Sequence, residues 1–149
     1  MVAIIGSYIY AIKVIGPRVV LNGEVVTRRQ IQCFTAGALI LWIASDWPMH
    51  DIAEEYLYSV HMLQHMMLSY FVPSLILLSI PKWLFDAVFG SGRGYRAIKF
   101  LSRAPVAGLL FNVMVMVAHI PDVVNRSVSN GPLHYSLHIL LIVTSLLMW

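Results

Sequence analysis

Charge is scarce in this sequence, and the scarcity excludes a soluble globular protein. Only 11% of its 149 residues are charged, whereas 59% are hydrophobic, and the mean hydropathy is +0.77. Soluble domains carry about 25% charged and roughly 45–50% apolar residues. A globule of this size cannot bury so many apolar side chains. The solvent that fits the composition is therefore a lipid bilayer.

Cysteine is nearly absent as well. The single cysteine, Cys33, excludes an intrachain disulfide and a metal site of the Cys-x-x-Cys type, so we expect its thiol to pack between helices. Residues 1–16 show neither a basic start nor a small-residue cleavage site. Because a secretory signal peptide needs both, we expect the first apolar segment to be retained as a span.

Apolar residues fall into five segments separated by polar or Gly/Pro-containing connectors. They predict an all-α, polytopic transmembrane helix bundle that forms one domain over residues 1–149. The expected spans lie at about 1–15, 30–45, 57–80, 105–120 and 133–149. A span needs about 20 residues to cross the hydrocarbon core, and only the third reaches that length comfortably. The first and fifth segments stop at the chain ends, so we expect both spans to be shortened.

Basic residues occupy alternate connectors and thereby predict the topology. The first connector holds Lys13, Arg18, Arg28 and Arg29, and the third holds Lys82, Arg93, Arg96, Lys99 and Arg103. These are nine of the ten basic residues, so the net charge of +3 indicates topology and not a nucleic-acid partner. The positive-inside rule places both connectors in the cytoplasm. The N-terminus is then outside.

The histidines all fall at the outer side in this topology. They are His50, His61, His65, His119, His134 and His138. Two pairs, His61/His65 and His134/His138, are spaced four residues apart. On a helix such residues share one face, with Cβ atoms about 5–6 Å apart, so two imidazoles can hold one ion. His119, at the end of the fourth span, could supply a further nitrogen.

The expected metal site therefore comprises His61, His65, His119, His134 and His138. Imidazole suits copper, zinc, nickel and iron, and a nearby thioether from Met49, Met62 or Met66 would favour Cu(I). Methionine is also a common filler of helix packing, which is the favoured role for these three. The competing interpretation is that each imidazole simply contacts headgroups or a neighbouring helix, which is what we expect of His50.

Three blocks of the sequence resemble a known family. The stretch His61-Met-Leu-Gln-His-Met-Met-Leu68 with the later Pro73, then His119-Ile-Pro121, then Leu133-His-Tyr-Ser-Leu-His138, are similar to motifs of the CtaG family of bacterial cytochrome c oxidase assembly proteins. The resemblance implies a seven-span fold, of which this chain would be a truncated version. It also implies a location in the bacterial plasma membrane and the oxidase subunits as partners.

The expected function is that of an assembly factor, not an enzyme, which binds copper through the outer-face histidines and assists metal insertion into the oxidase. Two alternatives stay open. Paired histidines could ligate a b-type haem in an electron-transfer subunit, although pairs on single helices fit a small ion better. A divalent-metal transporter would need ionisable groups through the bilayer centre, and these spans hold almost none.

Overall fold

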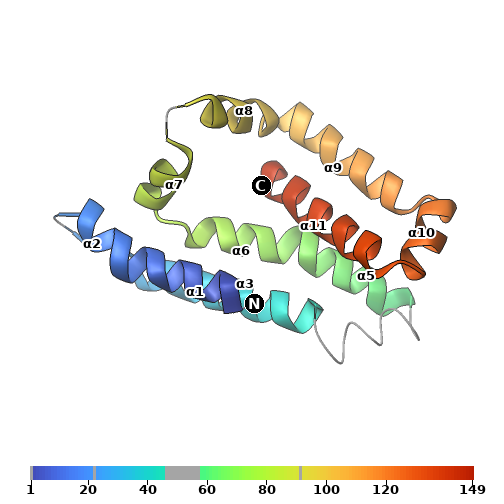
Figure 1. Cartoon of the computed structure of the whole chain (residues 1–149), viewed down its shortest axis with the longest axis horizontal. Coiled ribbons are helices and arrows are strands. Elements are labelled where there is room, and N and C mark those ends of the chain that lie inside the picture. The colour runs from blue at the N-terminus through green and yellow to red at the C-terminus, as the bar shows by residue number, and fades with distance from the viewer. Residues whose placement is uncertain (1, 22, 46–57, 91) are drawn as a thin grey trace.

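The structure is a computed structural model that describes residues 2–21, 23–45, 58–90 and 92–149. All regular structure within these residues is helical, which confirms the all-α prediction. The helices are α1 (Val2–Tyr10), η1 (Ala11–Ile15), α2 (Gly16–Val19), α3 (Arg28–Ser45), α5 (Tyr58–Met66), η2 (Met67–Phe71), α6 (Val72–Ser79), α7 (Lys82–Phe89), α8 (Arg93–Leu101), α9 (Ala104–Ala118), α10 (Pro121–Val128) and α11 (Gly131–Met148). Figure 1 shows the long helices side by side, with α7 and α8 towards one end of the bundle and α10 at the other.

Among the described residues, three helical runs are long and apolar enough to cross a membrane. They are Val2–Val19, Ser59–Ser79 and Gly131–Met148. A fourth candidate is the pair Gly94–Leu101 and Ala104–Ala118, whose two helices are bent by 76°. The protein is thus a multi-pass membrane protein with three to four such spans by length and composition, against about five expected. The expected span that is not among these candidates is α3. Its polar start, Arg28-Arg29-Gln30, lowers the mean hydropathy of the helix.

A π-helical turn interrupts the central run, and Pro73 explains its position. Pro73 has no N–H to donate to the carbonyl of Ser69, four residues earlier, and its ring would clash with that carbonyl in a regular helix. The chain widens there into η2, a common response in helices. The buried hydroxyl of Ser145 and the indole N–H of Trp149, the latter at 3.3 Å, donate to the Ser69 oxygen.

The packing of α3 on α6 depends on a close approach at Gly37. A Cβ atom at this position would lie 3.2 Å from Cβ of Leu75 and 3.3 Å from Cγ1 of Ile76. Near one end of the same interface, the buried Gln64 side chain donates to the carbonyl of Ala44 at 2.6 Å. This hydrogen bond between helices fixes α5 against α3.

The other end of the bundle is held by a contact between α2, the following connector and α7. Trp83 donates its indole N–H to the carbonyl of Val25 at 2.8 Å. Gly16 lies against the Val25 side chain so closely that an added Cβ would collide with it. Two prolines stand at helix starts: Pro81 is the N-cap of α7, and Pro121 is the first residue of α10.

Asn112 on α9 forms a hydrogen bond within its own helix. Its amide donates to the carbonyl of Gly108 at 2.7 Å. The Asn112 side chain is exposed within the chain. Gly108 likewise has open space beside it, whereas Gly37 sits in a helix interface.

Candidate metal centre

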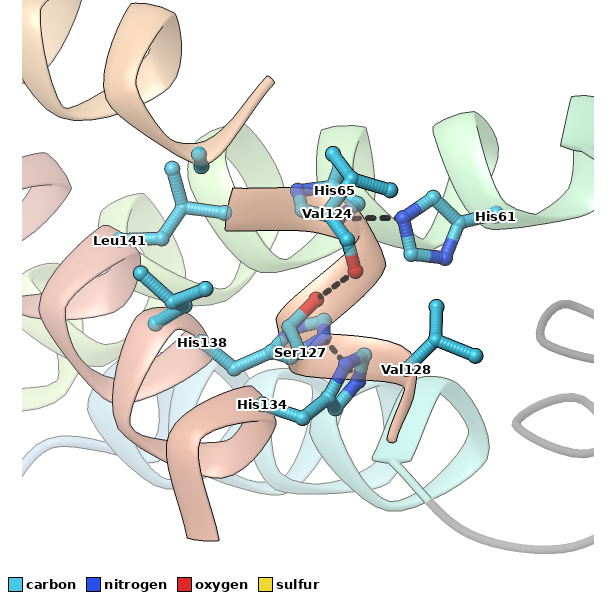
Figure 2. A pocket seen from close by; sticks show the side chains of 10 residues that line it. His61, His65, Val124, Ser127, Val128, His134, His138 and Leu141 are labelled. Atoms are coloured by element: carbon cyan, nitrogen blue, oxygen red, sulfur yellow. Dashed lines mark hydrogen bonds between the residues drawn. The ribbon is translucent and has the colours of Figure 1, made fainter. Parts of the chain in front are cut away.

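The five predicted histidines come from three separate parts of the chain. His61 and His65 lie on α5, His119 is the C-cap of α9, and His134 and His138 lie on the first two turns of α11. Figure 2 shows the α5 pair and the α11 pair around one pocket. The sixth histidine, His50, lies outside the described residues, as does Met49.

Each pair on a single helix is in direct contact. Nε2 of His61 and Nε2 of His65 are 2.9 Å apart, and the same atoms of His134 and His138 are 2.8 Å apart. One imidazole of each pair donates an N–H and the other accepts it. The four-residue spacing thus brings the two nitrogens of each pair together, as the helix geometry predicts.

His65 lies at the centre of the group. Its ring centroid is 4.4 Å from that of His61, 5.0 Å from that of His138 on α11, and 5.8 Å from that of His119. The centroids of His61 and His138 are 6.3 Å apart. The tertiary structure therefore joins the two sequence pairs into one group.

His119 has a fixed orientation at the edge of this group. Its Nδ1 lies 2.7 Å from the carbonyl oxygen of Val115, one turn earlier in α9. Because a carbonyl can only accept, Nδ1 carries the proton, and Nε2 keeps its lone pair. A backbone partner of this kind is a common way to fix the tautomer of a metal-binding histidine. His119 is also exposed, whereas the other four rings are half-buried.

The pocket between the pairs has a volume of about 170 Å³. The histidines line one side of it, and mostly apolar side chains complete the lining, namely Val124, Ser127 and Val128 of α10 and Leu141 of α11. Figure 2 shows α10 passing beside the two histidine pairs. Ser127 is buried, and its hydroxyl donates to the carbonyl of Val124 within α10.

Sequence reasoning missed α10, which it treated as a connector. The local signals were present, because Pro121 stands at the first helical position and Asp122 and Arg126 complement the helix dipole in the first and last turns. The apolar residues Val124 and Val128 also fall four positions apart, on one face. Asp122 is exposed in the first turn of α10.

The side chains of the methionines next to the α5 histidines lie outside the pocket. Neither Met62 nor Met66 lines the pocket, and the Met66 side chain is 53% exposed. Each follows a histidine by one residue and is therefore rotated by about 100° around the helix. The pocket is thus lined by imidazole nitrogens and not by these two thioethers.

The nitrogen–nitrogen distances within each histidine pair can be compared with those around a tetrahedral metal ion. Metal–nitrogen bonds of about 2.0–2.1 Å at tetrahedral angles place the ligand nitrogens about 3.3 Å apart. The nitrogens in each pair are a few tenths of an ångström closer than that, because they share a hydrogen bond. Among the described residues no three His, Cys, Asp or Glu side chains form a ready metal-binding group. A metal would have to replace the shared proton and spread the rings slightly.

Taken together, the helices and the pocket define a small multi-pass membrane protein in which histidines of α5 and α11 line one pocket, with the His119 ring 5.8 Å from that of His65. The model of the cytochrome c oxidase caa3 assembly factor family matches residues 6–149, almost the whole chain. The chain belongs to this family of assembly factors, as the three sequence blocks predicted. No curated protein and no solved structure matches it significantly.

Proposed function

We propose that this protein binds copper through His61, His65, His119, His134 and His138 and passes it to a subunit of cytochrome c oxidase. The observation that carries the proposal is the 5.0 Å separation of the His65 and His138 rings. This separation supports one ion shared by a pair from α5 and a pair from α11. The family membership supports an assembly role, which a binding protein performs without catalysis.

The chemistry of the donors fits copper as the cargo. Imidazole nitrogens bind Cu(I) and Cu(II), and copper lies at the top of the affinity order for divalent metals with nitrogen ligands. Each pair holds a proton between its two nitrogens, so metal binding exchanges that proton for the ion. The pocket wall from α10 limits the access of water to the bound ion.

Transfer to an acceptor requires ligands that can exchange one at a time. His119 is the exposed member of the group, while the pairs are half-buried. An acceptor ligand that displaces His119 first would leave the ion held by the helical pairs. We place this exchange at the outer face of a bacterial plasma membrane, which is the side that the basic connectors predict.

The test is copper binding by the detergent-purified protein. Wild type should retain copper after passage over a desalting column, and a variant with all five histidines changed to alanine should retain none. In cells, His61→Ala combined with His65→Ala should abolish oxidase maturation. If the double variant kept both its bound copper and full maturation of the oxidase, the proposal would be wrong.

A matched control separates nitrogen ligands from sulfur ligands. Met66→Leu changes a neighbouring residue on the same helix, keeps its volume and leaves the pocket lining intact. It should bind copper as wild type does. Loss of copper in Met66→Leu would assign the site to a thioether and contradict the all-nitrogen donor set.

Haem is less compatible with the geometry than a single ion. A b-type haem needs two imidazoles on opposite faces of a porphyrin. Here the contacts within each pair are 2.8–2.9 Å between nitrogens of one helix, which leaves no room for a porphyrin between them. A purified protein with a Soret band that disappears in the five-alanine variant would reverse this assignment.

A further inference from the structure

The end of the bundle opposite the histidines carries a strongly basic segment. Between positions 82 and 103 the sequence holds five basic residues and one acidic residue, Asp86. The described side chains among the basic ones are all exposed, namely Lys82, Arg96, Lys99 and Arg103. These side chains, with the helix α8 that carries two of them, form what we call the basic face.

The direction of α8 is set by its junction with α9. The two helices are bent by 76° across residues 102–103. Transmembrane helices tilt by about 20° on average, so when α9 crosses the bilayer, α8 runs close to the membrane plane. Its sequence has three basic residues in nine positions, which is unfavourable in hydrocarbon but suits the headgroup layer. The bend and the charge together favour an interfacial helix over the first half of a broken span for α8.

Apolar side chains accompany the charges at this end. Phe100 of α8 is 52% exposed, and Val88 of α7 is 64% exposed. The guanidinium carbon of Arg103 lies 5.3 Å from the centre of the Phe100 ring, a cation–π contact. An exposed aromatic ring beside exposed basic side chains matches the boundary between headgroups and acyl chains.

We propose that α8 lies in the membrane interface and that its basic face binds the headgroups of acidic phospholipids. Arg96, Lys99 and Arg103 supply the positive charges, and Phe100 inserts beside them. Charge complementarity selects the lipid class, because basic residues next to a span are attracted to an anionic surface and not to zwitterionic headgroups. An acidic segment of another protein is the competing partner.

This binding surface is independent of the histidine pocket. α9 has 15 residues and is therefore about 22 Å long, with α8 at its first end and His119 at its last. Variants of the basic face should leave copper binding unchanged. The lipid proposal can thus fail without affecting the proposed metal function, and the reverse also holds.

The experiment measures lipid selectivity directly. The protein is reconstituted in phosphatidylcholine vesicles with trace spin-labelled phosphatidylglycerol or spin-labelled phosphatidylcholine, and the motionally restricted fraction of each label is read by electron spin resonance. Wild type should prefer phosphatidylglycerol by about threefold or more, and high salt should weaken the preference. In the variant Arg96→Gln, Lys99→Gln, Arg103→Gln the ratio should fall to about one.

Two controls make the outcome decisive. The variant Arg96→Lys, Arg103→Lys keeps the charge and should keep the selectivity, and circular dichroism should show equal helicity in all variants. A triple-glutamine variant with wild-type selectivity, or a wild type without selectivity, would overturn the proposal. So would tight binding of poly-glutamate to wild type in vesicles that contain phosphatidylglycerol, since it would show the basic face open to a protein-like partner.

Discussion

The hydroxyl of Ser145 on α11 donates to the carbonyl oxygen of Ser69 in η2, and both residues are buried. That oxygen is available because Pro73 has no N–H to offer it. One proline therefore creates an acceptor in the middle of a span, and a serine 76 positions later uses it. The bond ties the helix of His61 and His65 to the helix of His134 and His138.

Ser145→Ala should destabilise the protein by about 1 kcal/mol, which is typical for one buried hydrogen bond between membrane helices. Unfolding in mixed micelles with increasing sodium dodecyl sulfate measures this change. Ser136→Ala is the matched control, since the Ser136 hydroxyl is exposed and bonds within its own helix. Equal stability of the two variants would show that the α11–η2 bond contributes nothing.

Gly37→Val should cost about 1–3 kcal/mol because the added atoms would overpack the α3–α6 interface. Even a Cβ atom would come within 3.2–3.3 Å of Leu75 and Ile76. Gly108→Val provides the comparison, because nothing lies within 4 Å of a Cβ there. The same micelle unfolding assay applies. A larger loss for Gly108→Val than for Gly37→Val would contradict the packing described for α3 and α6.

Gln64→Leu should separate a structural role from a role in metal binding. The substitution removes the hydrogen bond to the Ala44 carbonyl, so stability should fall by about 1 kcal/mol. Loss of a residue that orients a metal ligand typically lowers metal affinity by about tenfold or more. Copper affinity, measured by competition with a chromophoric chelator, should therefore change by less than about tenfold. A larger fall in affinity with unchanged stability would instead assign Gln64 to the orientation of His61 or His65.

The two histidine pairs should form one site and not two. Because the rings of His65 and His138 are only 5.0 Å apart, we expect one copper ion per chain. Replacing either pair by alanine should then remove nearly all tightly bound copper, as measured by elemental analysis against protein concentration. Two ions in wild type, with one left after loss of either pair, would mean two separate sites.

His119→Ala should have a smaller effect than loss of a pair. Its ring is the exposed one and stands 5.8 Å from that of His65. Copper should still bind, but it should transfer faster to a chelator because one ligand is missing. Stopped-flow transfer rates provide the measurement. Transfer at the wild-type rate would remove His119 from the proposed ligands.

The sequence alone determined the helical membrane fold and the two histidine pairs. Composition demands a bilayer, and the four-residue spacing forces the imidazoles of each pair onto one helix face, because both follow from local geometry. Pro73 likewise marks where the central run departs from a regular α-helix, through the missing N–H of a single residue. These features need no knowledge of which helices are neighbours.

Only the tertiary structure decided how the pairs meet. Nothing in the spacing of His65 and His138 brings α5 and α11 together, since their contact depends on packing between segments 73 residues apart. The short helices α7, α8 and α10 were also missed, because amphipathic segments of eight or nine residues resemble polar connectors. The wall that α10 adds to the histidine pocket is thus a product of the fold, while the histidines themselves can be identified in the sequence.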